Sequence, residues 1–156
     1  RATLMPYPFQ IVQGQKDILF VYEFASSNRI VHMSNHQESP VDSWMGWSNG
    51  KWEGDTLVID STGFTDRTWL DDHGNRHSDA LHVIERWTRI SADQLRYEAT
   101  IDDPKFYTKP WVAIDKLKMK LLPDNSDMIE MMCVPSELNA YNLKHGNLGN
   151  GITGKK

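Results

Sequence analysis

Short runs of alternating apolar and polar residues, separated by turn-forming residues, recur along most of this chain. The two-residue period places every second side chain on the same face, which is typical of β-strands in a half-buried sheet. Turn signals such as Gly14-Gln15 and the polar run 26–28 are those of hairpin loops. The expected strands, about nine on this pattern, are residues 9–13, 18–24, 29–34, 44–52, 56–61, 81–90, 95–101, 111–121 and 128–134.

This order of strands predicts an all-β fold, an antiparallel meander that closes into a lipocalin-like β-barrel. A β-sandwich is the alternative. The length of 156 residues suits one domain, which we expect to span residues 1–144. Residues from Ser136 could begin a short C-terminal helix capped by that serine. Residues 145–156 are rich in glycine and poor in apolar side chains, so we expect a flexible tail.

Composition excludes several classes of protein. The formal net charge of -4 argues against a general nucleic-acid binder, which needs a basic face to neutralise phosphates. No run approaches the roughly 20 apolar residues of a membrane-spanning helix, so no membrane span is expected. Cys133 is the only cysteine, which excludes an internal disulfide and a multi-thiolate metal site.

All six tryptophans lie between Trp44 and Trp111. An indole ring combines a large apolar area with one N–H donor, so several of them in a small all-β domain indicate a concave, aromatic-lined pocket. Aromatic residues are also common in strands, where they fill the core. Both interpretations stay open on the sequence alone.

The segment of residues 62–80 is long for a connection in a compact all-β domain. Loops of this kind often carry function, so we expect a lid over one end of the barrel. Trp69 and Leu70 are its strongest apolar pair beyond Phe64. We therefore predict that Trp69 packs inward and that His77 lies near the mouth of the barrel.

Three histidines, His73, His77 and His82, follow Asp71 and Asp72. Imidazole and carboxylate groups can bind zinc, iron or manganese, but this spacing is not diagnostic and also fits ordinary loop histidines or general acid–base use. We predict no metal and no cofactor. The chain has no Gly-rich phosphate loop and no Gly-x-Ser-x-Gly motif, which argues against nucleotide binding and the commoner covalent hydrolases.

Strand alternation predicts which side chains face the core. Trp52 should be buried, whereas Glu53 and Asp55 in the following turn should be exposed. Asp115 shares a face with apolar neighbours and could point inward, either as an acid or base or as half of an ion pair. Within residues 111–121 we expect solvent-facing Lys116, Lys118 and Lys120 and inward-facing Leu117, Met119 and Leu121.

Four segments carry distinctive motifs: residues 50–60 (GKWEGDTLVID), 68–71 (TWLD), 77–86 (HSDALHVIER) and 103–111 (DPKFYTKPW). They resemble a family of bacterial proteins, common in proteobacteria and acidobacteria, whose members read G-x-W-E-G-D-T-L-V-V-D, T-W-L-D, H-S-x-A-L-H-V-x-E-R and D-P-x-x-Y-T-K-P-W. The resemblance covers roughly residues 5–135 and brings no known activity with it.

The resemblance implies a periplasmic or secreted protein and an upstream segment before Arg1, because family members are longer at the N-terminus and often exported. The chain departs from the frequent family form at Trp47, where His or Tyr is expected, and this puts site chemistry at that position in doubt. The chemically capable residues of the matching motifs are Trp69, Asp71, His77, His82, Glu85, Tyr107 and Lys109.

The first functional hypothesis is binding of a small, largely apolar or aromatic molecule in a Trp-lined barrel cavity, with His82, Tyr107 or Lys109 orienting its polar end. The residues expected to line that cavity are Trp47, Trp69, Trp87, Tyr97, Tyr107, Lys109 and Trp111.

A second hypothesis is a cofactor-independent lyase, isomerase or hydrolase. It would use His77 or His82 as general base, oriented by Asp71 or Glu85. A third is an accessory subunit of a larger assembly, with a protein partner or a second copy of the chain. The first two differ in geometry, since an enzyme of this kind needs a histidine within hydrogen-bond reach of an acid at the pocket.

Overall fold

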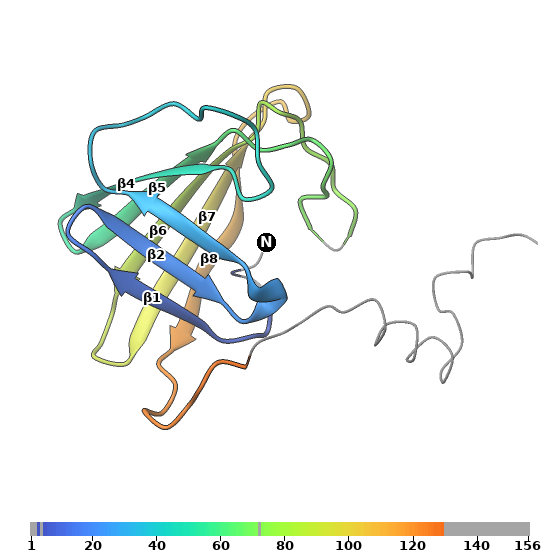
Figure 1. Ribbon diagram of the computed structural model, residues 1–156. Coiled ribbons are helices and arrows are strands. Elements are labelled where there is room, and N and C mark those ends of the chain that lie inside the picture. Colours follow the sequence, from blue (N-terminus) through green and yellow to red (C-terminus); the bar gives the residue numbers. More distant parts are fainter. Residues whose placement is uncertain (1–2, 4, 72, 130–156) are drawn as a thin grey trace, which may run out of the picture.

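A computed structural model describes residues 3, 5–71 and 73–129. They form one eight-stranded sheet (Figure 1). The strands are β1 (Phe9–Gln13), β2 (Asp17–Tyr22), β3 (Asn28–His32), β4 (Trp47–Glu53), β5 (Thr56–Thr62), β6 (His82–Arg89), β7 (Gln94–Asp102) and β8 (Trp111–Lys120). A short 3-10 helix, η2 (Phe24–Ser26), joins β2 to β3.

Neighbours in the sheet are neighbours in the chain, from β1 to β8. All pairs are antiparallel except β3 and β4, which run parallel through the pairs Val31–Ser48 and His32–Asn49. A parallel pair cannot be joined by a tight hairpin, and the long connection of residues 33–46 supplies the crossover. The prediction of a wholly antiparallel meander is wrong at this one pair.

The sheet curls on itself into an open, lipocalin-like barrel, with β1 and β8 at the two ends of its strand order (Figure 1). The all-β barrel expected from the sequence is confirmed. Within the described residues no helix is long and apolar enough to cross a bilayer.

Eight of the nine expected strands correspond to strands of the sheet. Of the ninth, residues 128–134, only Met128 and Ile129 are described, and neither lies in a strand. The possible helix from Ser136 and the tail 145–156 lie outside the described residues.

The concave face of the sheet holds the core. Alternation along β2 buries Ile18, Phe20 and Tyr22, and the same rule buries the inward residues of β3, β5, β6 and β7. Trp87 packs against Tyr97 at 4.4 Å and against Phe20 at 5.3 Å between ring centroids. These aromatic side chains fill the half of the barrel interior that forms the core.

Trp52 is 51% exposed, so its predicted burial is wrong, whereas Glu53 and Asp55 are exposed as expected. The strand face was inferred correctly, because Trp52 pairs with the buried Leu57. However, β3 pairs with β4 only as far as Asn49. The end of β4 therefore extends beyond its neighbour and leaves the indole in solvent.

Alternation in β8 is interrupted. Between the pairs Tyr97–Leu117 and Ala99–Ile114 the strand carries one extra residue, and Lys116 has a φ of 52°. Such a bulge rotates the side chains that follow it. The three lysines are exposed and Met119 packs on the core, as predicted. Leu117 is on the predicted face, since it pairs with the buried Tyr97, but it is 40% exposed. The inward positions predicted for Asp115 and Leu121 are wrong, because both are exposed.

Candidate functional site

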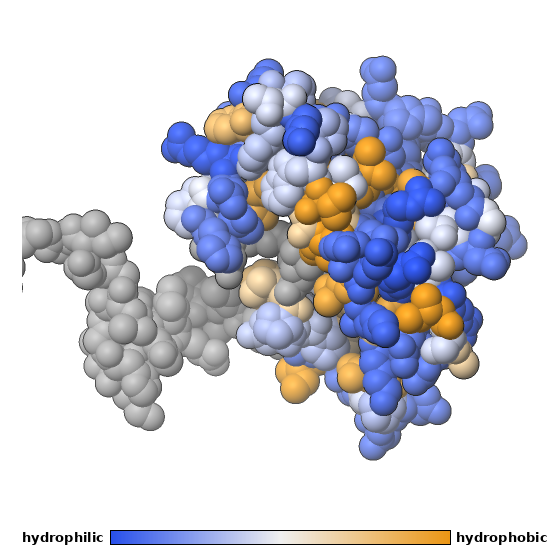
Figure 2. Space-filling view, turned by 180° about the vertical axis from the view of Figure 1, so that it is seen from behind, coloured by the Kyte–Doolittle hydropathy of each residue, from blue (hydrophilic) through white to orange (hydrophobic). Residues whose placement is uncertain are grey.

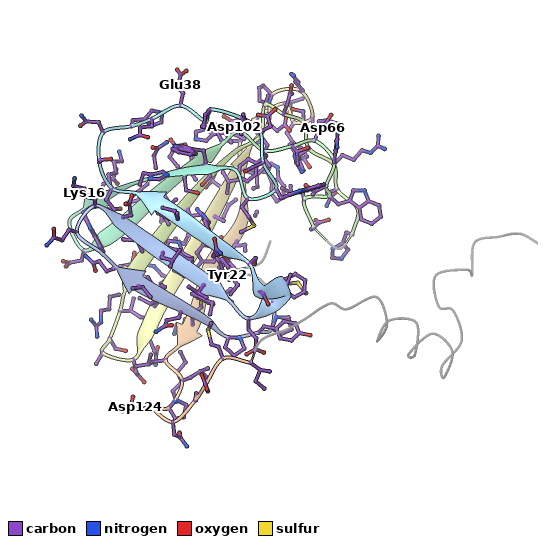
Figure 3. All side chains as sticks on the ribbon, viewed as in Figure 1. Lys16, Tyr22, Glu38, Asp66, Asp102 and Asp124 are labelled. Carbon is purple, nitrogen blue, oxygen red and sulfur yellow. The ribbon has the colours of Figure 1, made fainter. Side chains whose placement is uncertain are left out.

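The half of the barrel interior next to residues 63–81 is hollow. This cavity has a volume of about 400 Å³. It begins where the core ends: along β6 Val83 and Glu85 line it, whereas Trp87, the next inward residue, belongs to the core. Tyr22 points into this interior, whereas Lys16, Glu38 and Asp124 project outward (Figure 3). The aromatic lining consists of Tyr22, Phe24, Trp44, Phe64, Trp69, Tyr97 and Trp111.

The described residues of the segment 63–81, here called the mouth loop, edge the open end of the cavity. An isolated bridge between Trp69 and Arg76, with a 2.8 Å hydrogen bond from the amide of Leu70 to the carbonyl of Asn75, forms a small hairpin in this loop. Trp69 lines the cavity but is 58% exposed, so its predicted inward packing is wrong. A side chain on a projecting hairpin has few neighbours to cover it. Trp44 is likewise exposed at this rim.

His77 lies where the sequence placed it, at the cavity, and is 5% exposed. Its Nδ1 is 3.0 Å from the carbonyl oxygen of Ser78, and a carbonyl can only accept. Nδ1 therefore donates, and in the neutral ring Nε2 accepts from the hydroxyl of Thr68 at 2.7 Å. Asp71 lines the same cavity, but its carboxylate accepts from the amide of His73 and from Asn75. Neither oxygen of Asp71 orients His77.

Among the described residues, His77 is the histidine that lines the cavity, and neither of its hydrogen-bond partners is an acid. Two other described histidines have a close acid: Nε2 of His82 lies 2.6 Å from Oδ1 of Asp60, and Nδ1 of His32 lies 2.9 Å from Oδ1 of Asp17, and neither histidine lines the cavity.

Val83, the residue after His82 on β6, lines the cavity. Because successive side chains of a strand point to opposite faces, His82 faces the outside of the barrel. Asp60 lines a second pocket, about 450 Å³ in volume, on that outer surface together with Arg86, and among the described residues its wall carries no Phe, Trp or Tyr side chain.

Polar groups meet at the inner end of the cavity. Arg29 from β3 and Glu85 from β6 form an ion pair through Nη2 and Oε2. Arg29 also donates from Nε to Ser48 at 2.8 Å and from Nη2 to Ser61 at 3.1 Å. The hydroxyl of Tyr97 donates to Oε1 of Glu85 at 2.9 Å. We call Arg29, Ser61, Glu85 and Tyr97, which all line the cavity, the polar floor.

Both members of the ion pair are charged. Burial by itself raises the pKa of Glu85, but the charge of Arg29 and hydrogen bonds from Arg29 and Tyr97 outweigh it and hold this pKa below its usual value. Burial opposes the charge of Arg29 as well, yet Glu85 raises its pKa above the ordinary value. Burial first, and then Glu85, raises the pKa of Tyr97, so its hydroxyl stays protonated and donates.

The expected ligand-binding residues divide into two groups. Trp69, Tyr97 and Trp111 line the cavity. The other four are elsewhere: Trp47 stacks on His32 at 4.3 Å, Trp87 is in the core, Tyr107 donates to the carbonyl of Arg76 at 3.0 Å, and Lys109 is exposed.

Sequence reasoning missed Arg29, Tyr22 and Trp44. A signal for Arg29 was present, because alternation in β3 puts it on the same face as the buried Val31. A charged residue on a core face needs a buried partner, and Glu85 is the acid on the corresponding face of β6.

No group of three or more His, Cys, Asp or Glu side chains among the described residues could hold a metal ion. Comparison of the chain with protein-family models, curated proteins and solved structures gives no match.

Proposed function

We propose that this protein binds a small, largely apolar or aromatic molecule inside the barrel. The observation that carries the proposal is the cavity itself, about 400 Å³ in volume, with seven aromatic side chains and several aliphatic ones in its wall. Ligand sites typically have a volume of about 300–1,000 Å³ and combine an apolar wall with a few hydrogen-bonding groups. The polar floor supplies such groups here.

The geometry supports binding better than acid–base catalysis. An enzyme of the expected kind needs a histidine and an acid together at the cavity. Among the described residues, His77 at the cavity is bonded to Thr68 and to a carbonyl, whereas the His82–Asp60 pair lies on the outer face. A role as an accessory subunit stays a prediction.

Binding can be tested with N-phenyl-1-naphthylamine, an uncharged dye whose fluorescence rises in apolar surroundings. The native protein should increase the dye's emission, and binding should saturate at one dye molecule per chain. Ala113→Trp places an indole in the cavity wall and should abolish this increase. Val112 is the neighbouring residue on β8, 60% exposed and outside the cavity, so Val112→Trp is the matched control and should bind as the native protein does.

The proposal fails if the native protein leaves the dye dark, or if Ala113→Trp binds as well as Val112→Trp. Both variants should first show the native far-UV circular dichroism spectrum and melting temperature, so that a loss of binding reports on the cavity.

A further inference from the structure

The polar floor carries two opposite charges that neutralise each other. The side chains of Arg29 and Glu85 are 8% and 4% exposed and face the same cavity. The one other described acid that lines the cavity, Asp71, belongs to the mouth loop, and its carboxylate is already bonded to its own turn. The inner end of the cavity therefore has no net charge.

We propose that the cavity selects uncharged ligands: an apolar molecule with one hydroxyl, carbonyl or amide group directed at the polar floor. This inference rests on the proposed binding function and specifies the chemical class of its ligand.

An anion finds no free positive charge in the cavity. Two of the guanidinium nitrogens of Arg29 already donate to Ser48, Ser61 and Glu85. An anion would have to displace Glu85 from Arg29, which leaves a buried carboxylate without its partner, or accept from Nη1 of a guanidinium whose charge Glu85 already neutralises, beside a carboxylate that repels it. Both arrangements are strongly unfavourable in an interior from which water is excluded. The carboxylate of Asp71 at the mouth adds repulsion.

A cation meets the same difficulty. Each carboxylate oxygen of Glu85 already accepts a hydrogen bond, Oε2 from Arg29 and Oε1 from Tyr97. The guanidinium next to it repels a second positive charge. A bound cation would therefore lose its water at the inner end of the cavity without gaining an uncompensated acid.

A neutral polar group fits this floor. The hydroxyl oxygens of Ser61 and Tyr97 have lone pairs beyond the bonds they already make, so they can accept from a ligand hydroxyl or amide N–H. The proton of Tyr97 goes to Glu85, but Ser61 can donate to a ligand carbonyl when Ser48 donates to Ser61. The Tyr22 hydroxyl, bonded to Thr3 at 2.9 Å, lines the same space. One hydroxyl, carbonyl or amide of a ligand can hydrogen-bond there without disturbing the ion pair.

The test compares two dyes with the same ring skeleton. N-phenyl-1-naphthylamine is uncharged, and 1-anilinonaphthalene-8-sulfonate carries an added sulfonate. The native protein should bind the neutral dye at least about tenfold more tightly, because the buried sulfonate lacks a partner. Glu85→Gln frees the positive charge of Arg29 and should raise the sulfonate dye's affinity about tenfold, whereas Glu98→Gln on the outer face should not change the ratio of affinities.

Because Glu85→Gln leaves a buried guanidinium unpaired, Arg29→Met/Glu85→Gln is measured beside it. With both charges gone, this double variant should keep the preference for the neutral dye. Any gain in affinity for the sulfonate dye that Glu85→Gln produces should be lost when Ala113→Trp is added. Such a loss shows that the dye binds in the cavity and not to an unfolded chain.

Equal affinities of the native protein for the two dyes overturn charge selection while leaving the binding function intact. A folded Glu85→Gln variant with the native ratio of affinities also overturns it, as does a double variant that favours the sulfonate dye. Failure of both dyes to bind the native protein overturns the proposed function itself.

Discussion

Asp103, directly after β7, holds Ser78 of the mouth loop through two hydrogen bonds, 25 positions apart in the chain. Its Oδ2 accepts from the amide of Ser78 at 2.6 Å, and its Oδ1 accepts from the hydroxyl at 2.8 Å. Asp103 is 0% exposed. Because Ser78 adjoins His77, a carboxylate outside the cavity wall fixes one end of the loop that edges the cavity.

Replacing Asp103 by Asn should lower the free energy of unfolding by about 2 kcal/mol, because a charged acceptor of several hydrogen bonds is lost from a buried position. The amide also turns a donor toward one of the two groups of Ser78. The measurement is urea unfolding followed by circular dichroism. Asp102→Asn is the matched control on the adjacent, half-buried residue and should change stability by less than about 0.5 kcal/mol. Equal losses in the two variants would show that the Ser78 contacts contribute little.

Stability should also depend on pH through Asp103. Burial raises its pKa, but the hydrogen bonds from Ser78 and from the Lys105 amide outweigh burial and leave the pKa lowered. A lowered pKa stabilises the fold fully above the unfolded value of about 4, and this contribution is lost progressively as the pH falls below that value and through the lower pKa of the folded protein. The native protein should therefore exceed Asp103→Asn in stability at pH 7, by a margin that shrinks as the pH falls below about 4. Urea unfolding at pH 7, 5, 4 and 3 measures it, and a constant difference contradicts it.

Local pattern was enough to place the strands. β1 begins at Phe9 and ends at Gln13 as the alternation predicts, because the Gly14-Gln15 turn follows at once. The exposure of Trp52 was beyond such a pattern, since it depends on where β3 stops pairing with β4. The bulge at Lys116 was also hidden, because a positive φ at a lysine has no signature in the sequence.

The sequence also predicted only part of the site. Glu85 was expected to orient a catalytic histidine and Tyr97 to bind the ligand, and both face the cavity. Arg29 was missed because its partner Glu85 is 56 positions away and becomes a neighbour only when β3 and β6 meet across the barrel. His82 was assigned to the cavity because polar and apolar residues are mixed on both faces of β6, so the pattern could not distinguish inside from outside.

Two tryptophans test the assignment of core and surface. Trp87 is 3% exposed and packs against Phe9, Phe20 and Tyr97, so Trp87→Ala should destabilise the fold by about 3–5 kcal/mol. Trp52→Ala removes the same side chain from a site that is 51% exposed and should lower stability by less than about 1 kcal/mol. Chemical unfolding compares them. Similar losses would mean that the indole of Trp52 contributes to the core as Trp87 does.

Trp69 offers the sharpest separation of binding from stability. It lines the cavity from the mouth loop yet is 58% exposed, so little of the fold depends on it. Trp69→Ala should lower the free energy of unfolding by less than about 1 kcal/mol. The same change removes an aromatic contact with the bound molecule and opens the rim. The affinity for N-phenyl-1-naphthylamine should therefore fall about five- to tenfold, mainly through faster dissociation.

Stopped-flow dilution of the dye complex measures this dissociation, and calorimetry measures stability. Trp52→Ala is the matched control, because its indole is similarly exposed but lies outside the cavity lining. Its dye affinity should equal that of the native protein. If Trp69→Ala instead loses stability while dye affinity is unchanged, Trp69 supports the mouth loop alone. The dye would then make its aromatic contacts deeper in the cavity, at Tyr97 and Trp111.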